Sequence, residues 1–264
     1  MHRAQPHVIR DFQKEHGLKS NIRSIWKRLQ PVRKRNGNLF PDHDTLYHEV
    51  RETLVIPHCP ICTLLQASTD ERLGYLFHEN VNDPGVREEL RSSMGYCSRH
   101  AADAVRCGNA LGLTIISRDL LMQFLHHTKR DGYGAPTEQR TECPLCVMER
   151  EDTHLYLYAL GDALRESDIR TLYRNGFGLC LPHLEEIYGY CNEETAKWLA
   201  MCEERKMHLL MDELGEFIRK SDYRFIGEPI GTEGNAWSRA MEKISGGNIQ
   251  RISDSFLMRH TEDV

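Results

Sequence analysis

Apolar residues recur every three to four positions along much of the chain, which is the spacing of an amphipathic helix. Alternation with a period of two is absent, so no strand is predicted. In the first half, the positions that predict helices are Tyr47, Val50, Leu54, Val55, Leu64, Leu65, Leu73, Leu76, Phe77, Val86 and Leu90. In the second half, they are Cys146, Val147, Tyr156, Leu160, Ile169, Leu172, Tyr173, Trp198, Leu199, Cys202, Leu209, Leu210, Leu214, Phe217 and Ile218. The pattern therefore predicts an all-α protein.

Turn residues divide this pattern into short segments. Pro57 ends the first predicted helix, which starts at Asp44 or Thr45, and Asn82–Gly85 forms a turn in which Asp83 caps the next helix. Gly161-Asp162 is expected to loosen a later helix, and 131–136 is the predicted hinge. A loop at 227–234 precedes a short helix at about 235–244.

Cysteine and histidine follow one motif that occurs twice. Each copy has Cys-Pro-x-Cys followed, after 33 or 34 intervening residues, by Cys-x2-His. The first copy supplies Cys59, Cys62, Cys97 and His100, and the second supplies Cys143, Cys146, Cys180 and His183. A glycine precedes the third cysteine of each copy by two positions, as Gly95 and Gly178. This agreement indicates a duplicated unit.

Three thiolates and one imidazole are the ligand set of a closed tetrahedral zinc site. We therefore expect two zinc ions, one for the quartet of each copy, and each quartet would tie a loop to the start of a helix. An iron–sulfur cluster with one histidine ligand is the alternative metal group. Cycling between thiol and disulfide is a further alternative, although the βαβ context of thioredoxin-like motifs is absent. Whether the two quartets bind separately or pool their ligands stays open.

The remaining cysteines and histidines are expected to be structural. Cys107 and Cys191 follow the two motif histidines by seven and eight residues, and buried packing is their expected role. Cys202 lies on the apolar face of the longest predicted helix, which places it in the core. His58 and the pair His126-His127 are expected to be solvated.

Charge is unevenly distributed over the 264 residues. Residues 1–45 hold ten Lys/Arg and four Asp/Glu, a net charge of +6, so the rest carries −11 of the total −5. Ile22, Ile25, Trp26 and Leu29 add a narrow apolar stripe to this basic arm. An arm of this kind suits nucleic acid, which residues 1–41 would contact, membrane phosphates or an acidic partner. A solvated tail is the simpler interpretation.

The chain divides by sequence into four parts, namely a basic arm (1–45), a first helical repeat (46–134), a second repeat with the long helix (135–225) and a C-terminal extension (226–264). No secretory signal and no membrane span are recognised, so a cytoplasmic protein is expected. No phosphate loop, nucleophile elbow or His-Glu-x2-His helix is found, so the sequence names no reaction and favours a protein that is not an enzyme without excluding one. The sequence predicts a metal-stabilised helical protein that binds an unknown protein partner.

The motifs Cys-Pro-Ile-Cys, Gly-Tyr-Cys-Ser-Arg-His, Cys-Pro-Leu-Cys and Gly-Leu-Cys-Leu-Pro-His resemble those of an uncharacterised family of bacterial and archaeal proteins. Phe217–Phe225, Glu228-Pro229 and Ala236–Ala240 are similar to the C-terminal pattern of that family. The likeness covers about residues 45–246 and leaves the first 40 residues outside it. The resemblance implies a duplicated Cys/His unit and no particular activity.

Overall fold

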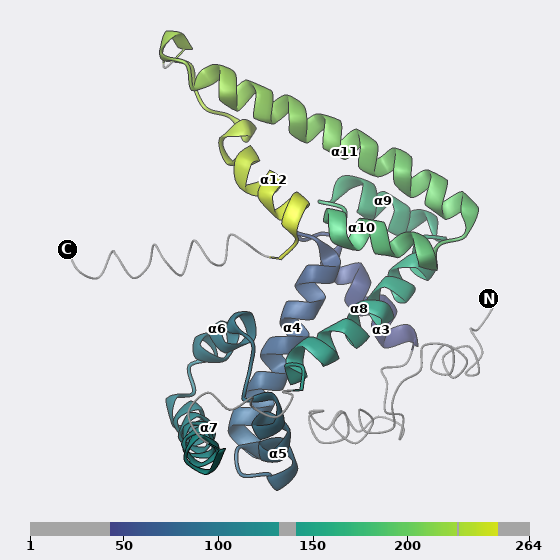
Figure 1. Cartoon of the computed structure of the whole chain (residues 1–264). Helices are drawn as coiled ribbons and strands as arrows, with labels where there is room; N and C mark the ends of the chain where they lie inside the picture. The colour runs from purple at the N-terminus through teal and green to yellow at the C-terminus, as the bar shows by residue number, and fades with distance from the viewer. Residues whose placement is uncertain (1–42, 132–140, 226, 248–264) are drawn as a thin grey trace. The chain divides into compact units, whose positions relative to one another are not determined.

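The computed structural model describes residues 43–131, 141–225 and 227–247, and every regular element in them is helical (Figure 1). The all-α prediction is thus confirmed for the described residues, and none of their helices has the length and apolar character needed to cross a membrane. The predicted stripe in the arm and the tail after residue 247 lie outside these ranges, as does the hinge beyond Asp131.

Contacts divide the chain into two compact units, and this grouping runs across the sequence repeats. Of the described residues, unit 1 contains those within Gln66–Asp152, and unit 2 contains Asp44–Leu65 and those within 153–247. The chain passes from unit 2 to unit 1 within helix α4 and returns within helix α8.

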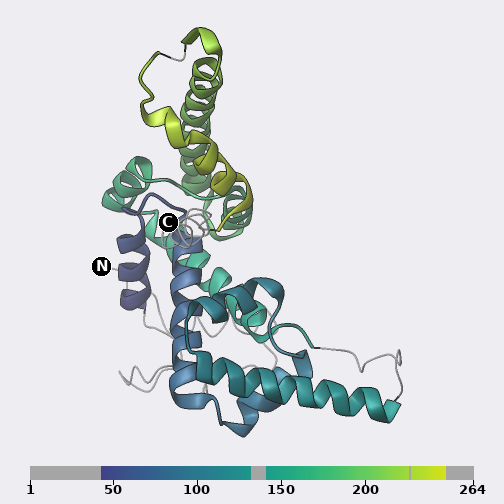
Figure 2. The same cartoon turned by 90° about the vertical axis from the view of Figure 1, so that its left-hand side faces the viewer.

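Unit 2 has a core of aliphatic side chains with one buried tyrosine, Tyr173. Its elements are α3 (His43–Thr53), the start of α4 (Pro60–Tyr75), the end of α8 (Pro144–Ala163), α9 (Ser167–Asn175), α10 (Leu181–Ile187), the 3-10 turn η2 (Tyr188–Tyr190), α11 (Glu193–Lys220), the 3-10 turns η3 (Tyr223–Phe225) and η4 (Thr232–Asn235), and α12 (Ala236–Ser245). The predicted apolar positions Val50, Leu54 and Leu199 are buried here, because α3, α4, α8, α9 and α11 each turn one apolar face inward. Helix α12 returns beside α11 (Figures 1 and 2).

Unit 1 has a second, separate core that includes Leu73, Phe77, Leu90 and Met148. Its elements are the end of α4, the π-helical turn η1 (Leu76–Asn80), α5 (Pro84–Ser93), α6 (Ser98–Arg106), α7 (Ala110–Asp131) and the start of α8. Helix α7 contacts α5, α6 and η1 (Figure 2). The sequence pattern did not predict α7, because its leucines and isoleucines are spread over more than one face.

Local signals set several helix ends as predicted. The side chain of Asp83 accepts a hydrogen bond from the Val86 N–H, and Pro84 is the first residue of α5. Gly95 and Gly178 both have positive φ, at 90° and 82°, which explains the matched glycines. Met94 also adopts the left-handed conformation, with a φ of 57°, so α5 ends one residue before the expected glycine.

One prediction about a helix is wrong. Helix α8 is not loosened at Gly161-Asp162, because it continues to Ala163. A Cβ at Gly161 would lie 2.8 Å from the Tyr190 carbonyl oxygen, so the glycine lets another backbone approach the helix. The predicted long helix is present as α11, in which Leu209 and Ile218 are exposed.

Candidate metal sites

The structure gathers the eight motif residues into two groups of four ligand atoms, and within each group all atoms lie within 4.8 Å of one another. The unit 2 site consists of Cys59, Cys62, Cys180 and His183, and the unit 1 site consists of Cys97, His100, Cys143 and Cys146. The eight predicted residues therefore come together, but the grouping by sequence copy is wrong. Each site takes Cys-Pro-x-Cys from one copy and Cys-x2-His from the other.

The length of α4 gives the physical reason for this exchange. Its 16 residues extend about 24 Å at 1.5 Å per residue, and they leave unit 2 before α5 and α6 begin. The Cys59–Cys62 segment and the Cys97–His100 segment thus belong to different units. Helix α8 does the same in the opposite direction, because it starts at the unit 1 site and ends in unit 2.

All four ligand pairs share one local geometry, the first turn of a helix. Cys59, Cys97, Cys143 and Cys180 each precede a helix, and the carbonyl of each accepts the N–H four residues later. The second ligand of every pair lies three residues after the first, so the two side chains are on the same side of the turn. Two helix N-termini therefore face each site, and their dipoles favour thiolates there.

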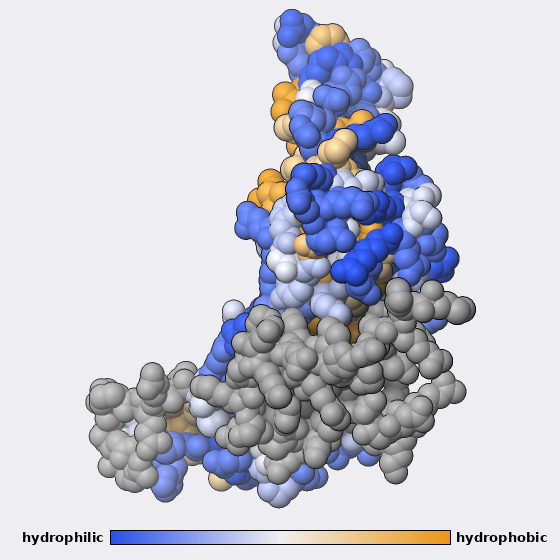
Figure 3. Space-filling view, turned by 90° about the vertical axis from the view of Figure 1, so that its right-hand side faces the viewer, coloured by the Kyte–Doolittle hydropathy of each residue, from blue (hydrophilic) through white to orange (hydrophobic). Residues whose placement is uncertain are grey.

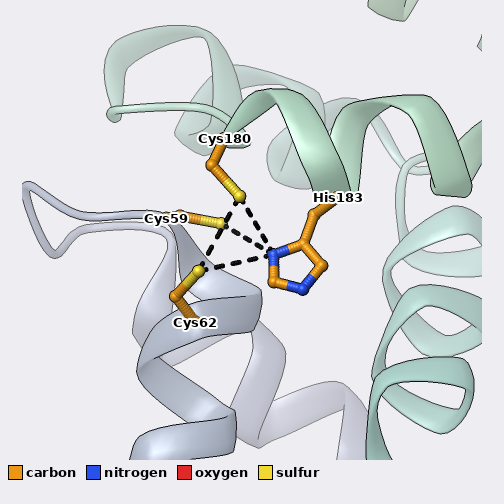
Figure 4. A group of neighbouring side chains, drawn as sticks. All are labelled: Cys59, Cys62, Cys180 and His183. Carbon is orange, nitrogen blue, oxygen red and sulfur yellow. Dashed lines mark hydrogen bonds between the residues drawn. The ribbon is translucent and has the colours of Figure 1, made fainter. Parts of the chain in front are cut away.

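In the unit 2 site, the three sulfur atoms lie on one side of the His183 ring and face its Nδ1 (Figure 4). The distances from Nδ1 are 3.5 Å to Cys59 Sγ, 3.4 Å to Cys62 Sγ and 3.1 Å to Cys180 Sγ. The Sγ atoms of Cys62 and Cys180 are 3.7 Å apart. Cys59 and Cys180 are fully buried, whereas Cys62 and His183 are half-buried.

The unit 1 site has the same arrangement. Nδ1 of His100 lies 3.4 Å from Cys97 Sγ, 3.5 Å from Cys143 Sγ and 3.4 Å from Cys146 Sγ. The Sγ atoms of Cys97 and Cys146 are 3.6 Å apart. His100 is completely buried.

These distances match the edges of a tetrahedron around a single ion. An ion with sulfur ligands at about 2.3 Å and a nitrogen ligand at about 2.0–2.1 Å has S–S edges of about 3.8 Å and S–N edges of about 3.6 Å. All nine cysteines are free thiols, so no disulfide accounts for the close sulfur atoms. Each group could hold one metal ion.

Comparison with known proteins relates part of the chain to one family and indicates no function. Residues 55–136 match the model of a family of unknown function, DUF6062. The predicted resemblance to an uncharacterised family is confirmed over this segment, which contributes Cys59 and Cys62 to one site and Cys97 and His100 to the other. No curated protein and no solved structure matches the chain.

Neighbouring thiols resist being ionised together in both sites. In unit 2, hydrogen bonds from Cys59 and Cys62 lower the pKa of Cys180 to about 4, while the hydrogen bond with Cys180 raises the pKa of Cys62. A thiolate therefore forms readily at one position and opposes a second beside it. A divalent cation removes that opposition, because it attracts every thiolate in the group.

The unit 1 site shows the same inequality among its thiols. Burial raises the pKa of Cys143, but hydrogen bonds from His100 and from the Cys97 and Cys146 backbone outweigh it and lower this pKa to about 6. Burial and Cys97 raise the pKa of Cys146 to about 12. A bound cation would bring these unequal thiols into one common ionised state.

Carboxylates next to the ligands were missed by the sequence analysis. Oε2 of Glu149 lies 3.5 Å from Nε2 of His100, and Glu149 also pairs with Arg99. Burial raises the pKa of Glu149, but these two partners outweigh it and lower that pKa to about 2. Glu203 and Glu242 are buried in unit 2. A lone glutamate in a helix gives no sequence signal that distinguishes it from a solvated one.

The other cysteines and histidines differ in part from expectation. Cys107 is exposed, so the prediction of buried packing is wrong for it. Cys191 and Cys202 are half-buried against the unit 2 core. His58 is not solvated, because its Nδ1 lies 2.9 Å from Glu242 Oε2. His126 is exposed as predicted.

Proposed function

We propose that each Cys3His group holds one zinc ion in a closed structural site, and that the chain is a zinc-stabilised helical binding or adaptor protein of the cytoplasm. The observation that carries this proposal is the pair of four-atom groups with the edge lengths of a tetrahedron around one ion. Sulfur and imidazole ligands favour zinc among the common divalent ions of proteins.

A single ion fits the ligand spacing better than a cluster does. An iron–sulfur cluster distributes its protein ligands over two or more iron atoms, so those ligands lie farther apart than the ligands of one ion. In both groups, all four ligand atoms lie within 4.8 Å of one another. This spacing supports zinc over the iron–sulfur alternative.

The number of protein ligands supports a structural rather than a catalytic role. A catalytic zinc site has three protein ligands and keeps its fourth position for water or substrate. Here four side chains fill the tetrahedron in each unit. We therefore assign the two ions to folding, in which each would add on the order of 10 kcal/mol of apparent stability.

The surface of α7 supports a binding role. Five large apolar side chains of this helix are between 41% and 72% exposed, and they are Leu111, Leu121, Met122, Phe124 and Leu125. Exposed apolar side chains that gather on one element are typical of surfaces that bind other proteins. Large apolar side chains are also exposed on α11 and α12, among them Leu209, Ile218 and Trp237. On the face drawn in Figure 3, apolar residues form patches among hydrophilic ones.

Metal content and a visible spectrum test the proposal. Protein purified anaerobically without added metal is expected to be colourless and to hold two zinc ions per chain. Iron with sulfide and absorbance near about 400 nm would replace zinc with clusters and make redox chemistry the function. Absence of metal together with a reversible disulfide would indicate thiol chemistry instead.

Nucleic-acid binding by the arm stays a separate prediction, because residues 1–41 lie outside the described part of the chain. Binding through the arm would fall steeply with salt and disappear when residues 1–41 are deleted. Binding that is absent or insensitive to salt would refute it.

A further inference from the structure

The C-terminal end of α12 lies against the unit 2 site and reaches both segments that carry its ligands. This helix follows the longest helix and is far from the Cys/His motifs in sequence, yet two of its charged residues, Glu242 and Lys243, are buried. Burying charge in a short helix requires partners for that charge. Glu242 is partnered by the first ligand segment, and Lys243 is partnered by Glu203 of α11, which in turn contacts the second ligand segment.

Glu242 holds the first ligand segment. Its side chain is 2% exposed, and Oε1 accepts a hydrogen bond from the Cys59 backbone N–H at 3.3 Å. The same carboxylate lies 2.9 Å from Nδ1 of His58, the residue before Cys59. One carboxylate thus fixes the backbone on which the first thiol is mounted.

Lys243 acts on the second ligand segment through Glu203 of α11. Its ammonium group donates to Oε2 of Glu203, which is fully buried. Oε1 of Glu203 accepts the backbone N–H of Leu179 at 3.1 Å and the hydroxyl of Tyr173. Because Leu179 immediately precedes Cys180, this network fixes the backbone that positions the third thiol.

The two glycines after α12 contact the sulfur atoms themselves. The Gly247 N–H donates to Cys62 Sγ at 3.2 Å, and a Cβ at Gly246 would lie 3.3 Å from Cys180 Sγ. Both glycines have positive φ, at 72° and 80°, which side-chain-bearing residues rarely adopt. The chain therefore passes close to two of the three thiols.

In unit 1 the carboxylate nearest to the ligands is placed differently. Glu149, which faces His100, lies on α8, the helix whose first turn carries Cys143 and Cys146. That support is local, whereas the support of the unit 2 site comes from a helix about 60 residues beyond Cys180 and His183.

We propose that α12 is a positioning element of the unit 2 site, so that metal retention there depends on the docking of α12 and the docking of α12 depends on the metal. By thermodynamic linkage, the two dependences share one coupling free energy. The inference rests on metal binding by the two groups. It adds that one of the two ions is linked to the C-terminal helix and the other is not.

The test is the rate of metal release from the full-length chain loaded with Co²⁺, whose thiolate absorption reports occupancy. A chelator in excess removes both ions, and the Cys62→Ser/Cys180→Ser variant identifies the phase that belongs to the unit 1 site. Glu242→Leu is expected to speed release from the unit 2 site by about 10- to 100-fold, the usual effect of removing a group that orients a ligand. Glu242→Gln keeps one acceptor oxygen and should have a smaller effect.

Two controls separate positioning from general destabilisation. Glu204→Leu, on the exposed side of α11, should leave both phases unchanged. Glu149→Gln should speed only the unit 1 phase. If Glu242→Leu speeds both phases equally, or neither, the proposal is overturned.

Hydrogen exchange of the unaltered chain gives a second measurement without any substitution. Removal of the metal should increase exchange of the α12 amides more than exchange of the amides of α9 in the same unit. Equal protection of α12 with and without metal would overturn the coupling. A chain that binds two Co²⁺ ions but purifies with another metal overturns only the zinc assignment; a chain that binds none overturns both proposals.

Discussion

Paired cysteine substitutions distinguish the observed ligand grouping from grouping by sequence copy. Cys62→Ser/Cys180→Ser removes two ligands from the unit 2 site and leaves the unit 1 site intact. Cys62→Ser/Cys97→Ser removes one ligand from each site, although both residues belong to the first sequence copy. The structure therefore predicts one full-affinity ion for the first variant and none for the second.

The expected loss of metal affinity follows from the number of ligands that each variant removes. Structural zinc binds with an apparent free energy of about 10–16 kcal/mol at neutral pH, so two ligands of four represent about 5–8 kcal/mol if the ligands contribute equally. That loss corresponds to about four to six orders of magnitude in affinity, and a single ligand to about half as many. A site left with two ligands should lose its ion during gel filtration in metal-free buffer. A site left with three ligands should bind its ion about 100- to 1,000-fold more weakly.

Zinc per chain after gel filtration, measured by mass spectrometry, is the assay, and far-UV circular dichroism follows the helices. The exposed, non-ligand substitution Cys107→Ser is the control and should keep two ions. If Cys62→Ser/Cys97→Ser keeps one tightly bound ion and Cys62→Ser/Cys180→Ser keeps none, the exchange of ligands between copies is refuted.

Three further predictions concern the units and their packing. A fragment of residues 66–152, which contains the whole unit 1 site, should fold and bind one ion, whereas a fragment of residues 46–134 should not; equal folding of both, judged by circular dichroism with zinc, would contradict the contact-based units. Gly161→Ala should destabilise the protein by about 1–3 kcal/mol because its Cβ meets the Tyr190 carbonyl. Gly74→Ala, a helix glycine with open space around it, should instead stabilise by up to about 1 kcal/mol, and denaturant unfolding compares the two. Asp152→Ala should cost about 3–5 kcal/mol, because it removes a buried carboxylate that pairs with the guanidinium group of Arg72. Glu193→Ala, which breaks an exposed pair with Lys197, should change stability by less than about 0.5 kcal/mol in the same assay.

Much of this fold could be predicted from local sequence signals. Helical spacing identified α3, α5 and α9, and Asp83 with Pro84 identified the start of α5, because these signals act within one or two turns. The eight candidate ligands could be found for the same reason, since two thiols three residues apart on a helix start are fixed by local geometry.

Which distant segments share a metal site could not be predicted from such local signals. Nothing near Cys59 indicates whether Cys97 or Cys180 completes its site, because that choice depends on how far α4 carries the chain. Glu203 and Glu242 were missed for a related reason. Their burial is decided by partners at Leu179 and Cys59, which are distant in sequence.

The two crossings of the chain between the units also order events during synthesis. The Sγ atoms that meet in the unit 1 site are 49 residues apart in sequence, and those in the unit 2 site are 118 apart. The longer loop costs only about 0.8 kcal/mol more to close, so entropy hardly separates the sites. The order in which residues emerge from the ribosome has a larger effect on when each site is completed, since domains form as their residues appear. Cys59 and Cys62 precede the other six ligands in the sequence and must remain reduced until Cys180 and His183 are made. The unit 2 site, which holds the earliest ligands, is therefore completed last.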